Sequence, residues 1–366
     1  MTDWDVIVVG GGPGGSTCAR RLVEAGRRVL LVDAARFPRE KPCAGWITPP
    51  VLDLLGLVPS ALAEAGLTVE PITAFETGLL GQPFVTTPYG GPVSYGIRRV
   101  EFDDFLLRRC GAHLELGTRV TSIVHRNDAW IVNDTWRAPV LVGAGGHFCP
   151  VARRLEPSPG RRAAPKDFIT AQEIEIPLTA DAARQAPHTP EFHFCRDLEG
   201  YGWVFRKGNC LNVGFGRRAS PGFPAHAAAF QRHLAARYDL PREALERWKG
   251  HAYLLAPDGR PPVADGALLV GDAAGLADAA SGEGIRAAVD SGGLAAETIV
   301  AANGRHTRDR LAPYADLLAA RYGHRRRVGL SRFIPAPVKR ALAPALMRSP
   351  WFARRVLLDG WFLKAS

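Results

Sequence analysis

The chain has 366 residues, of which 46% are hydrophobic and 22% are charged, and its mean hydropathy is −0.05. This length and composition suit about two domains with a large core and exclude a disordered chain, a collagen-like repeat and a polytopic membrane protein. The net charge is +10, yet residues 321–366 hold 11 basic residues and one acidic residue, so the remainder is balanced at 35 of each sign. A neutral body with a basic tail does not suggest a nucleic-acid-binding protein.

The cysteines and the N-terminus predict a cytoplasmic protein. Six cysteines occur without a CxxC pair or metal-ligand spacing, which is typical of reduced thiols. The chain starts directly on a strand pattern, without a signal peptide, and no apolar run reaches the roughly 18 residues of a membrane-spanning helix. Histidine motifs such as HxxxH and HExxH are absent, so no metal is predicted. A peripheral position at the inner face of the membrane stays open.

The first 33 residues have the pattern of a dinucleotide-binding unit. The β-branched run 4–9 predicts a buried parallel strand, residues 16–25 predict a helix, and residues 28–32 predict a second strand. The first strand and the helix are joined by a GxGxxG loop that contains Gly10, Gly12, Pro13, Gly14 and Gly15. Strand, glycine loop, helix, strand and acid in this order distinguish a real fingerprint from a chance match.

The loop's residue types suit a pyrophosphate. Gly10 permits the tight turn, Gly12 lets backbone amides approach the phosphates, and Gly15 lets the helix pack on the strand. The helix N-terminus adds unpaired N–H groups and a positive dipole. Asp33, followed by Ala34, ends the second strand and is placed to accept hydrogen bonds from a ribose diol.

A second glycine-rich stretch favours FAD over NAD. The apolar strand 267–270 is followed by a Gly-Asp pair and then, after more glycines, by a helix that runs toward residue 302. A carboxylate at a strand end, followed by glycines at a helix start, suits a ribityl chain and the oxygen-rich edge of a flavin. The predicted cofactor residues in this stretch are Gly271, Asp272, Gly282, Gly284 and Ile285.

With these motifs, the sequence resembles the geranylgeranyl reductase family of FAD-dependent oxidoreductases, within the hydroxybenzoate-hydroxylase-like flavoproteins. The matching stretches, in family order, are 10–33, 41–45, 99–103, 201–205 and 271–285. The resemblance implies that Asp33 binds the adenosine ribose, that Asp272 binds the ribityl or pyrophosphate region, and that Arg99 lies near the cofactor. It also implies that Val120 contacts adenine through its backbone, and that a loop approaches the flavin ring with Cys43, Ala44 and Gly45.

The sequence departs from the family pattern at three points. Residues 144–146 read Ala-Gly-Gly where relatives have Ala-Asp-Gly, Ala44 replaces a glycine, and Arg206 replaces a proline. The stretch 143–146 lacks the GxGxxG spacing, so it predicts another part of the FAD domain and not a second Rossmann domain. We therefore expect an external electron donor: NADPH that docks transiently, or a separate reductase or ferredoxin.

Between residues 168 and 215 the hydrophobic period changes to two, which predicts a largely antiparallel sheet. The resemblance implies that this sheet walls a substrate chamber. Tyr201 and Trp203 are two residues apart and so share one face; they either line a pocket for an apolar chain or belong to the sheet core. Cys43 either contacts substrate or flavin or is a buried, inert thiol. These three residues are the catalytic candidates.

The predicted fold class is α/β: a Rossmann-type FAD-binding domain, an inserted, mainly antiparallel β-sheet substrate domain, and a C-terminal helical segment. The FAD domain is expected at 1–70, 96–165 and 255–305, the substrate domain at 71–95 and 166–254, and the basic helical segment at 306–366. In residues 321–366, basic side chains alternate with Trp, Phe and Leu. That pattern suits a helix at an anionic membrane surface or a cap that packs on the body.

The leading interpretation is an enzyme that reduces carbon–carbon double bonds of an apolar isoprenoid or lipid-like substrate. Reduced flavin N5 would give a hydride, while the protein supplies orientation and a dry chamber. A flavin monooxygenase or halogenase that acts on an apolar or aromatic natural product is the alternative, although residues 201–206 lack the halogenase W-x-W-x-I-P motif. A third interpretation is a membrane-surface flavoprotein that only relays electrons.

Overall fold

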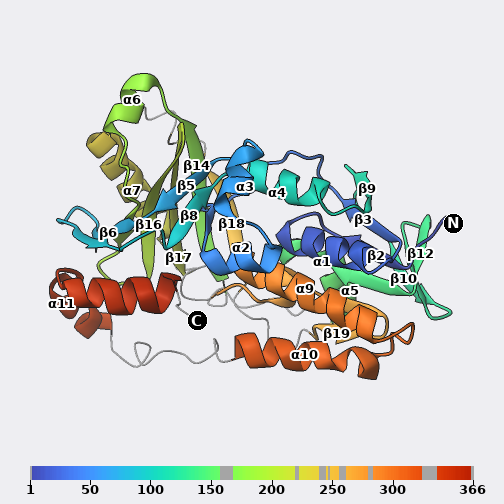
Figure 1. Ribbon diagram of the computed structural model, residues 1–366. Coiled ribbons are helices and arrows are strands. Elements are labelled where there is room, and N and C mark those ends of the chain that lie inside the picture. The colour runs from blue at the N-terminus through green and yellow to red at the C-terminus, as the bar shows by residue number, and fades with distance from the viewer. Residues whose placement is uncertain are drawn as a thin grey trace.

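The computed structural model describes residues 2–156, 168–218, 222–238, 245, 248–254, 261–278, 283–323 and 336–363. The molecule is elongated, with an α/β body at one end and a large sheet flanked by helices at the other (Figure 1). The helical elements are α1 (Pro13–Glu24), α2 (Pro49–Leu55), α3 (Pro59–Glu64), α4 (Arg99–Arg108), η1 (Gly146–Phe148), α5 (Pro150–Leu155), α6 (Ala180–Gln185), α7 (Phe223–Tyr238), η3 (Gly271–Ala274), α9 (Ile285–Ala301), α10 (Arg308–Tyr322), α11 (Ala336–Met347) and η6 (Phe352–Leu363).

The α/β body is built on a six-stranded sheet in the order β19-β20-β13-β2-β3-β9. Its strands are parallel except for the β19–β20 pair. They are β2 (Val6–Val9), β3 (Val29–Asp33), β9 (His113–Leu116), β13 (Val140–Gly143), β19 (Val263–Ala264) and β20 (Ala267–Leu269). The β2 side chains are buried on both faces, as expected for a parallel strand that is covered by two layers.

Helices α1, α9 and α10 cover one face of this sheet. A smaller sheet, in the order β1-β12-β11-β10, and α5 cover the other; its strands are β1 (Thr2–Asp3), β10 (Ile123–Arg126), β11 (Ala129–Val132) and β12 (Trp136–Ala138). The Tyr314 hydroxyl of α10 donates a 2.7 Å hydrogen bond to the Leu269 carbonyl at the end of β20. The result is a three-layer arrangement with its cores on both sides of the central sheet.

The second body is a seven-stranded sheet in the order β18-β14-β17-β16-β15-β6-β7. It is antiparallel except where β15 pairs with β6 in parallel. Its strands are β6 (Ala74–Leu79), β7 (Val85–Pro88), β14 (Phe168–Pro177), β15 (Glu191–Phe194), β16 (Gly200–Lys207), β17 (Cys210–Arg218) and β18 (Lys249–Leu254). A three-stranded sheet of β5 (Val69–Ile72), β8 (Ser94–Ile97) and β4 (Trp46–Ile47) lies in the segment that links the bodies.

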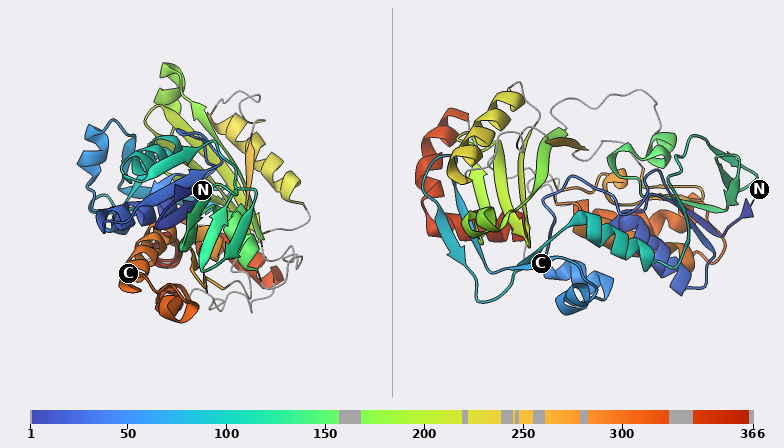
Figure 2. Two further views of the ribbon diagram at one scale, coloured as in Figure 1. Left: turned by 90° about the vertical axis from the view of Figure 1, so that its right-hand side faces the viewer. Right: turned by 90° about the horizontal axis from the view of Figure 1, so that it is seen from above.

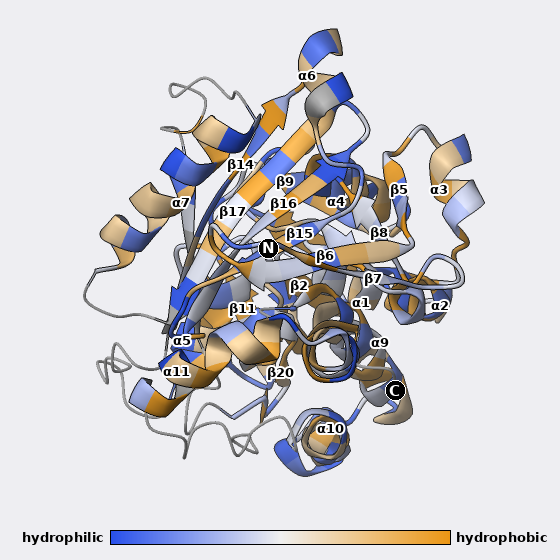
Figure 3. Ribbon diagram, turned by 90° about the vertical axis from the view of Figure 1, so that its left-hand side faces the viewer, coloured by the Kyte–Doolittle hydropathy of each residue, from blue (hydrophilic) through white to orange (hydrophobic). Residues whose placement is uncertain are grey.

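Helix α7 packs on one face of the large sheet, and the C-terminal elements α11 and η6 pack on the other. Figure 2 shows α7 and the red C-terminal helices on either side of the strands. In Figure 3 both α7 and α11 alternate between hydrophobic and hydrophilic colours, as amphipathic helices do. The cap that was expected for the C-terminal segment is therefore present, with Ala343, Met347, Leu357, Leu358 and Phe362 buried in it.

The predicted fold class is confirmed, including the change from a parallel to a mainly antiparallel sheet. The first helix begins at Pro13 and not at residue 16, because proline is well suited to the first helical turn. The stretch 143–146 begins at the last residue of β13, a strand of the same sheet as the fingerprint strand, as expected for one nucleotide-binding body. The domain boundaries stay a prediction. Among the described residues, no helix has the length and hydrophobicity needed to cross a membrane.

Candidate functional site

The glycine loop lies between β2 and α1, and three of its glycines are required by close backbone approach. Gly10 has φ +115°, and a Cβ there would lie 2.4 Å from the Ala144 carbonyl oxygen. A Cβ on Gly15 would lie 1.9 Å from the Gly10 carbonyl oxygen, and one on Gly14 would lie 2.8 Å from the Ala288 carbonyl oxygen in α9. These glycines therefore hold α1 against the sheet and against α9.

Gly12 is different, because the space beside it is open. Among the described atoms, a Cβ on Gly12 would meet only the Arg39 guanidinium, at 3.6 Å. Gly12 precedes α1 as its N-cap, with extended backbone at φ −72°. The opening lies at the N-terminus of a twelve-residue helix, where unpaired N–H groups and the helix dipole favour an anion.

Asp33, the last residue of β3, hydrogen-bonds to the glycine loop. Its carboxylate accepts a hydrogen bond from the Gly11 N–H at 2.7 Å and another from the Ala35 N–H, also at 2.7 Å. Asp33 itself is half-buried, while the adjacent Ala34 is exposed. The acid is therefore held at the mouth of the loop, as the spacing predicts.

A group of cationic side chains lies beside the open position at Gly12. Arg99, buried at the start of α4, forms a two-pronged salt bridge with Asp103 at 2.7 and 2.8 Å. Arg39 reaches the same carboxylate at 3.1 Å, and its Nη1 is buried with no partner in the described part of the chain. One aspartate thus orients two arginines and leaves a guanidinium N–H available for an anion.

Lys41 adds a third cation with an altered pKa. Burial and the neighbouring Arg99 charge lower the pKa of Lys41 to about 8, against the pull of Asp272. For Arg99, burial disfavours the charge, but Asp103 outweighs it and raises the pKa of the guanidinium. The pKa of Lys41 therefore depends on both the arginine pair and the Asp272 carboxylate in η3.

Asp272 lies in η3, after the third strand, and beside the N-terminus of α9. A Cβ on Gly284, the N-cap of α9, would lie 3.0 Å from Asp272 Oδ1. Gly271 has φ +58°, and its N–H donates to Ser291 Oγ at 2.9 Å. Ile285 is buried, whereas Gly282 lies outside the described residues.

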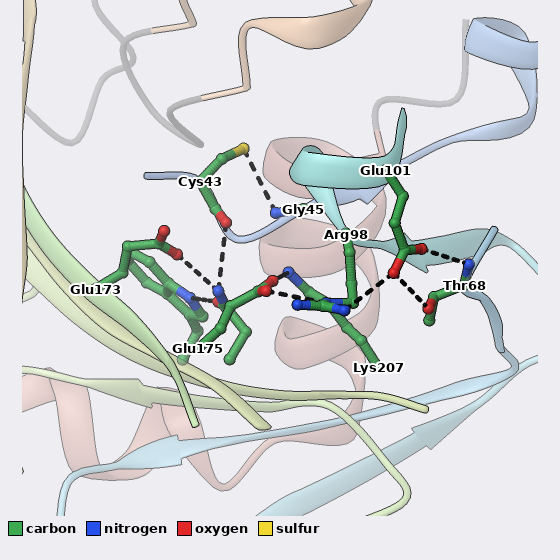
Figure 4. Close-up of polar contacts among 10 residues, drawn as sticks. Cys43, Gly45, Thr68, Arg98, Glu101, Glu173, Glu175 and Lys207 are labelled. Atoms are coloured by element: carbon green, nitrogen blue, oxygen red, sulfur yellow. Dashed lines mark hydrogen bonds and ion pairs between the residues drawn. The ribbon is translucent and has the colours of Figure 1, made fainter. Parts of the chain in front are cut away.

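Cys43 lies where the two bodies meet. The Gly45 N–H donates to its Sγ at 3.4 Å, and the Asn212 side-chain amide donates to its carbonyl oxygen, also at 3.4 Å. The same Asn212 amide group donates to Glu173 at 2.7 Å, and its oxygen accepts from the Trp203 indole N–H at 2.7 Å. Figure 4 shows Cys43 above this row of polar groups.

Burial raises the pKa of Glu173 to about 7, although Lys207, Asn212 and the Cys43 backbone N–H all favour its ionised form. Its neighbour Glu175 accepts from Lys207 Nζ at 3.0 Å and from Arg98 Nε at 3.1 Å. The part of the sheet face beside the Cys43–Gly45 loop is therefore polar and carries both signs of charge.

The rest of that face is aromatic. Tyr201 and Trp203 do share one face of β16, with ring centroids 6.1 Å apart. The Trp203 indole lies over Gly214 of β17, where a Cβ would come within 2.1 Å of the ring. The surrounding rings are those of Trp46, Phe75, Phe192, Phe194, Phe205 and Phe362.

The remaining predicted residues lie at the edges of the site. Val120 packs against the core between the central sheet and the smaller sheet, and Ala44 packs against the aromatic cluster. Gly45 has φ +62° and leaves no room for a Cβ, since the Ile97 carbonyl oxygen would be 2.2 Å away. Their contacts with a cofactor stay predictions.

Sequence reasoning missed Arg39, Glu173 and Asn212 and did not assign a role to Lys41. Lys41 stands beside Cys43 in the stretch that matched the family, which was a usable signal. The alternating pattern placed Glu173 and Asn212 on strands, but only the sheet register brings them together.

Comparison with known proteins identifies the family. Residues 8–39 match the family model of the NAD(P)-binding Rossmann-like domain. Menaquinone reductase from Mycobacterium tuberculosis strain H37Rv is 31% identical, across 94% of this chain and 88% of that protein. Geranylgeranyl diphosphate reductase from Rhodobacter capsulatus is 28% identical, across 81% of this chain and 75% of that protein.

The chain belongs to the geranylgeranyl reductase family of FAD-dependent oxidoreductases. A geranylgeranyl bacteriochlorophyll reductase-like protein from Thermoplasma acidophilum has the same fold, with a TM-score of 0.77 and 22% identity across 95% of this chain and 91% of that one. PqsL of Pseudomonas aeruginosa, described as a probable FAD-dependent monooxygenase, also shares the fold, with a TM-score of 0.67 and 21% identity across 96% of this chain and 99% of that one.

This reductase-family chain uses FAD as its cofactor, and its residues fit that group. The open position at Gly12, the partnerless Arg39 Nη1 and the α1 N-terminus all converge on one place beside Asp33. Two phosphates need N–H donors and positive charge there, and a ribose needs an acceptor for its hydroxyls.

Proposed function

We propose that this oxidoreductase reduces carbon–carbon double bonds in the isoprenoid chain of a lipid-like substrate. The observation that carries the proposal is the aromatic face of the large sheet, which η6 covers at Phe192 and which the Trp203–Asn212 contact joins to the polar groups beneath Cys43. An apolar chain needs such a face for burial, and a reacting bond needs fixed polar groups at one end of it. Menaquinone and geranylgeranyl diphosphate, the compounds in the names of two relatives, are both isoprenoid compounds.

The cofactor would be held by three groups of residues. Gly12, Pro13, Gly14 and the cations Arg39 and Lys41 would bind the pyrophosphate; Asp33, Ala34 and Val120 would bind the adenosine; Asp272, Gly284 and the Cys43–Gly45 loop would border the ribityl chain and the ring. Bound, reduced FAD would supply a hydride to one carbon of the double bond, and the Cys43 thiol or water would give a proton to the other. The chain's own part is to orient the substrate, exclude water and hold Cys43 beside the reacting bond.

Anaerobic turnover tests the proposal. The purified FAD-loaded protein is mixed with a reduced viologen dye and with menaquinone or geranylgeranyl diphosphate, and the products are analysed by mass spectrometry. A gain of two hydrogens per reduced bond, without oxygen, supports the proposal. A gain of one oxygen atom that requires O₂ would replace it with a monooxygenase. Flavin oxidation with neither substrate consumed would favour an electron relay.

The electron donor is proposed to be external. The described residues contain one complete GxGxxG fingerprint, and the cofactor site uses it. Transient docking of NADPH, or a separate reductase or ferredoxin, would then reduce the flavin. Rapid-mixing measurement of flavin bleaching with NADPH and with reduced ferredoxin distinguishes the two, because only the true donor bleaches the flavin within one turnover time.

We further propose that the C-terminal segment touches an anionic membrane surface while it caps the sheet. Val338, Leu342 and Trp351 are large apolar side chains with 44%, 48% and 68% of their surface exposed, although this segment buries its other apolar face. The exposed Arg348 and Arg355 lie in the same segment. Exposed apolar side chains with basic neighbours suit a lipid interface.

Vesicle co-sedimentation tests this contact. Binding to vesicles with anionic phosphatidylglycerol should weaken as salt rises, since the Debye length is roughly 8 Å at physiological ionic strength and each bound Arg adds about 1 kcal/mol. The double variant Leu342→Ser, Trp351→Ser should lose binding. Phe148→Ser is the matched control, because Phe148 is 66% exposed on a different element. Equal binding by wild type and the double variant would refute the contact.

A further inference from the structure

Two side chains of the large sheet, Glu173 and Asn212, lie beside the backbone of Cys43. The Asn212 amide donates to the Cys43 carbonyl oxygen, and the Cys43 backbone N–H lies near enough to the Glu173 carboxyl group to favour its ionised form. Glu173 and Asn212 also bind each other at 2.7 Å. Both side chains are buried, and Asn212 is fully so.

The sheet dictates this geometry. Strands β14 and β17 are antiparallel neighbours, with Glu173 opposite Gly214 and Glu175 opposite Asn212. Glu173 and Asn212 are thus diagonal neighbours on one face, within reach of each other. Gly214 carries no side chain, so the Trp203 indole lies flat over it and donates to Asn212 Oδ1. The contact network runs from the aromatic wall through Asn212 to Glu173 and Cys43.

We propose that Glu173 and Asn212 are positioning residues that set the place of the Cys43 loop against the cofactor and couple it to Trp203. This rests on the proposed function of Cys43 in double-bond reduction. Burying a carboxyl group is unfavourable unless something compensates, and a fold that needed only a strand residue here would use an apolar side chain. The carboxyl group is retained where it meets the Cys43 loop, at the place where the two bodies meet.

The ionised form of Glu173 is the stronger hydrogen-bond acceptor. A carboxylate accepts from two N–H donors more strongly than a neutral acid does. The charged groups around it are Glu175 on its own strand, Lys207 on β16, and Lys249 opposite it on β18. Lys207 pairs with Glu175 and Lys249 pairs with Glu40, so each cation has another acidic partner. Because the pKa of Glu173 is about 7, the strength of its hydrogen bonds should change near neutral pH.

Cysteine-selective ¹⁵N labelling of the FAD-loaded protein gives a direct test. The six cysteine amides are assigned by single Cys→Ser variants, and their resonances are followed from pH 5.5 to 8.5. We expect the Cys43 amide proton to move downfield with a midpoint near pH 7 in the wild type, and to stay constant in Glu173→Gln. The matched control is Glu191→Gln, a buried glutamate of the same sheet that binds His193 and Arg237.

Turnover gives the second readout. We expect kcat of Glu173→Gln to fall about tenfold, with its pH limb near 7 lost and FAD affinity unchanged, because a small misplacement of a reacting group costs up to about 100-fold. A flat Cys43 resonance in the wild type, or a variant with wild-type kcat and pH profile, would overturn the inference. The wild-type titration needs no variant to fold. If neither isoprenoid is reduced but Cys43 titrates through Glu173, the contact stands and the proposed function fails instead.

Discussion

The Phe362 ring, close to the end of the chain, stacks on the Phe192 ring of β15 with centroids 4.3 Å apart. Tyr89 OH of the segment after β7 donates to Asp359 at 2.8 Å, and Arg354 lies 4.6 Å over the Tyr89 ring. The basic C-terminal segment therefore completes the core on the face of the large sheet opposite α7. Its apolar residues serve the fold first, and only those left exposed are available for a membrane.

Phe362→Ala should lower the free energy of unfolding by about 3 kcal/mol, since it opens a cavity in an aromatic cluster. Phe362 is 2% exposed, whereas Phe148 is 66% exposed, so Phe148→Ala is the matched control and should change stability by less than about 0.5 kcal/mol. Urea unfolding of both variants measures the difference. Equal stability of the two would mean that the stacked rings do not hold the segment in solution.

Gly12→Val should abolish FAD binding and leave the fold intact. The backbone at Gly12 is extended and, among the described atoms, a Cβ there meets only Arg39, at 3.6 Å, so the methyl groups occupy the cofactor's space. Gly15→Val should unfold the loop, because its Cβ would lie 1.9 Å from a backbone oxygen. Flavin absorbance after gel filtration and thermal unfolding separate the two effects. Retained flavin in Gly12→Val would place the pyrophosphate elsewhere.

FAD affinity should fall about tenfold between pH 7 and pH 9 if the protonated Lys41 binds the pyrophosphate, because its pKa is lowered from 10.5 to about 8. The stability of the FAD-free protein should change in the opposite direction. The unfolded chain binds the proton more tightly, so stability rises between about pH 8 and pH 10.5. Titration of FAD by flavin fluorescence at each pH measures the affinity. Lys41→Met should flatten the dependence; an unaltered slope would assign it to another group.

Cys43→Ser should keep FAD and slow turnover by about 100-fold, the low end of the range for a lost proton-transfer group. Serine also accepts a hydrogen bond, so the contact with the Gly45 N–H survives and the loop keeps its shape. Cys195→Ser is the control, since Cys195 is buried next to Arg217 and Asp197. Turnover of the isoprenoid substrate and flavin content are measured on both. Wild-type turnover in Cys43→Ser would remove the thiol from the reaction.

The nucleotide-binding half of this protein could be predicted from the amino-acid sequence. The order of strand, glycine loop, helix, strand and acid is local, and Gly15 is required by contact with Gly10 in its own turn. Gly10 and Gly14 are required by Ala144 and Ala288, which lie far from the loop in sequence. The change of hydrophobic period from mixed to two likewise predicted the second sheet, because alternation reports which side of a strand is buried. The FAD assignment followed from these patterns together with the family resemblance.

The contacts between residues far apart in the chain could not be predicted in this way. Glu173 and Asn212 are 39 positions apart, and Asn212 and Cys43 are 169 apart, so their contact depends on strand register and on how the two bodies pack. The parallel pairing of β15 with β6 and the stacking of Phe362 on Phe192 are decided in the same way. Composition and period show that a side chain is buried or basic, but its partner is set by long-range packing, which local patterns do not encode.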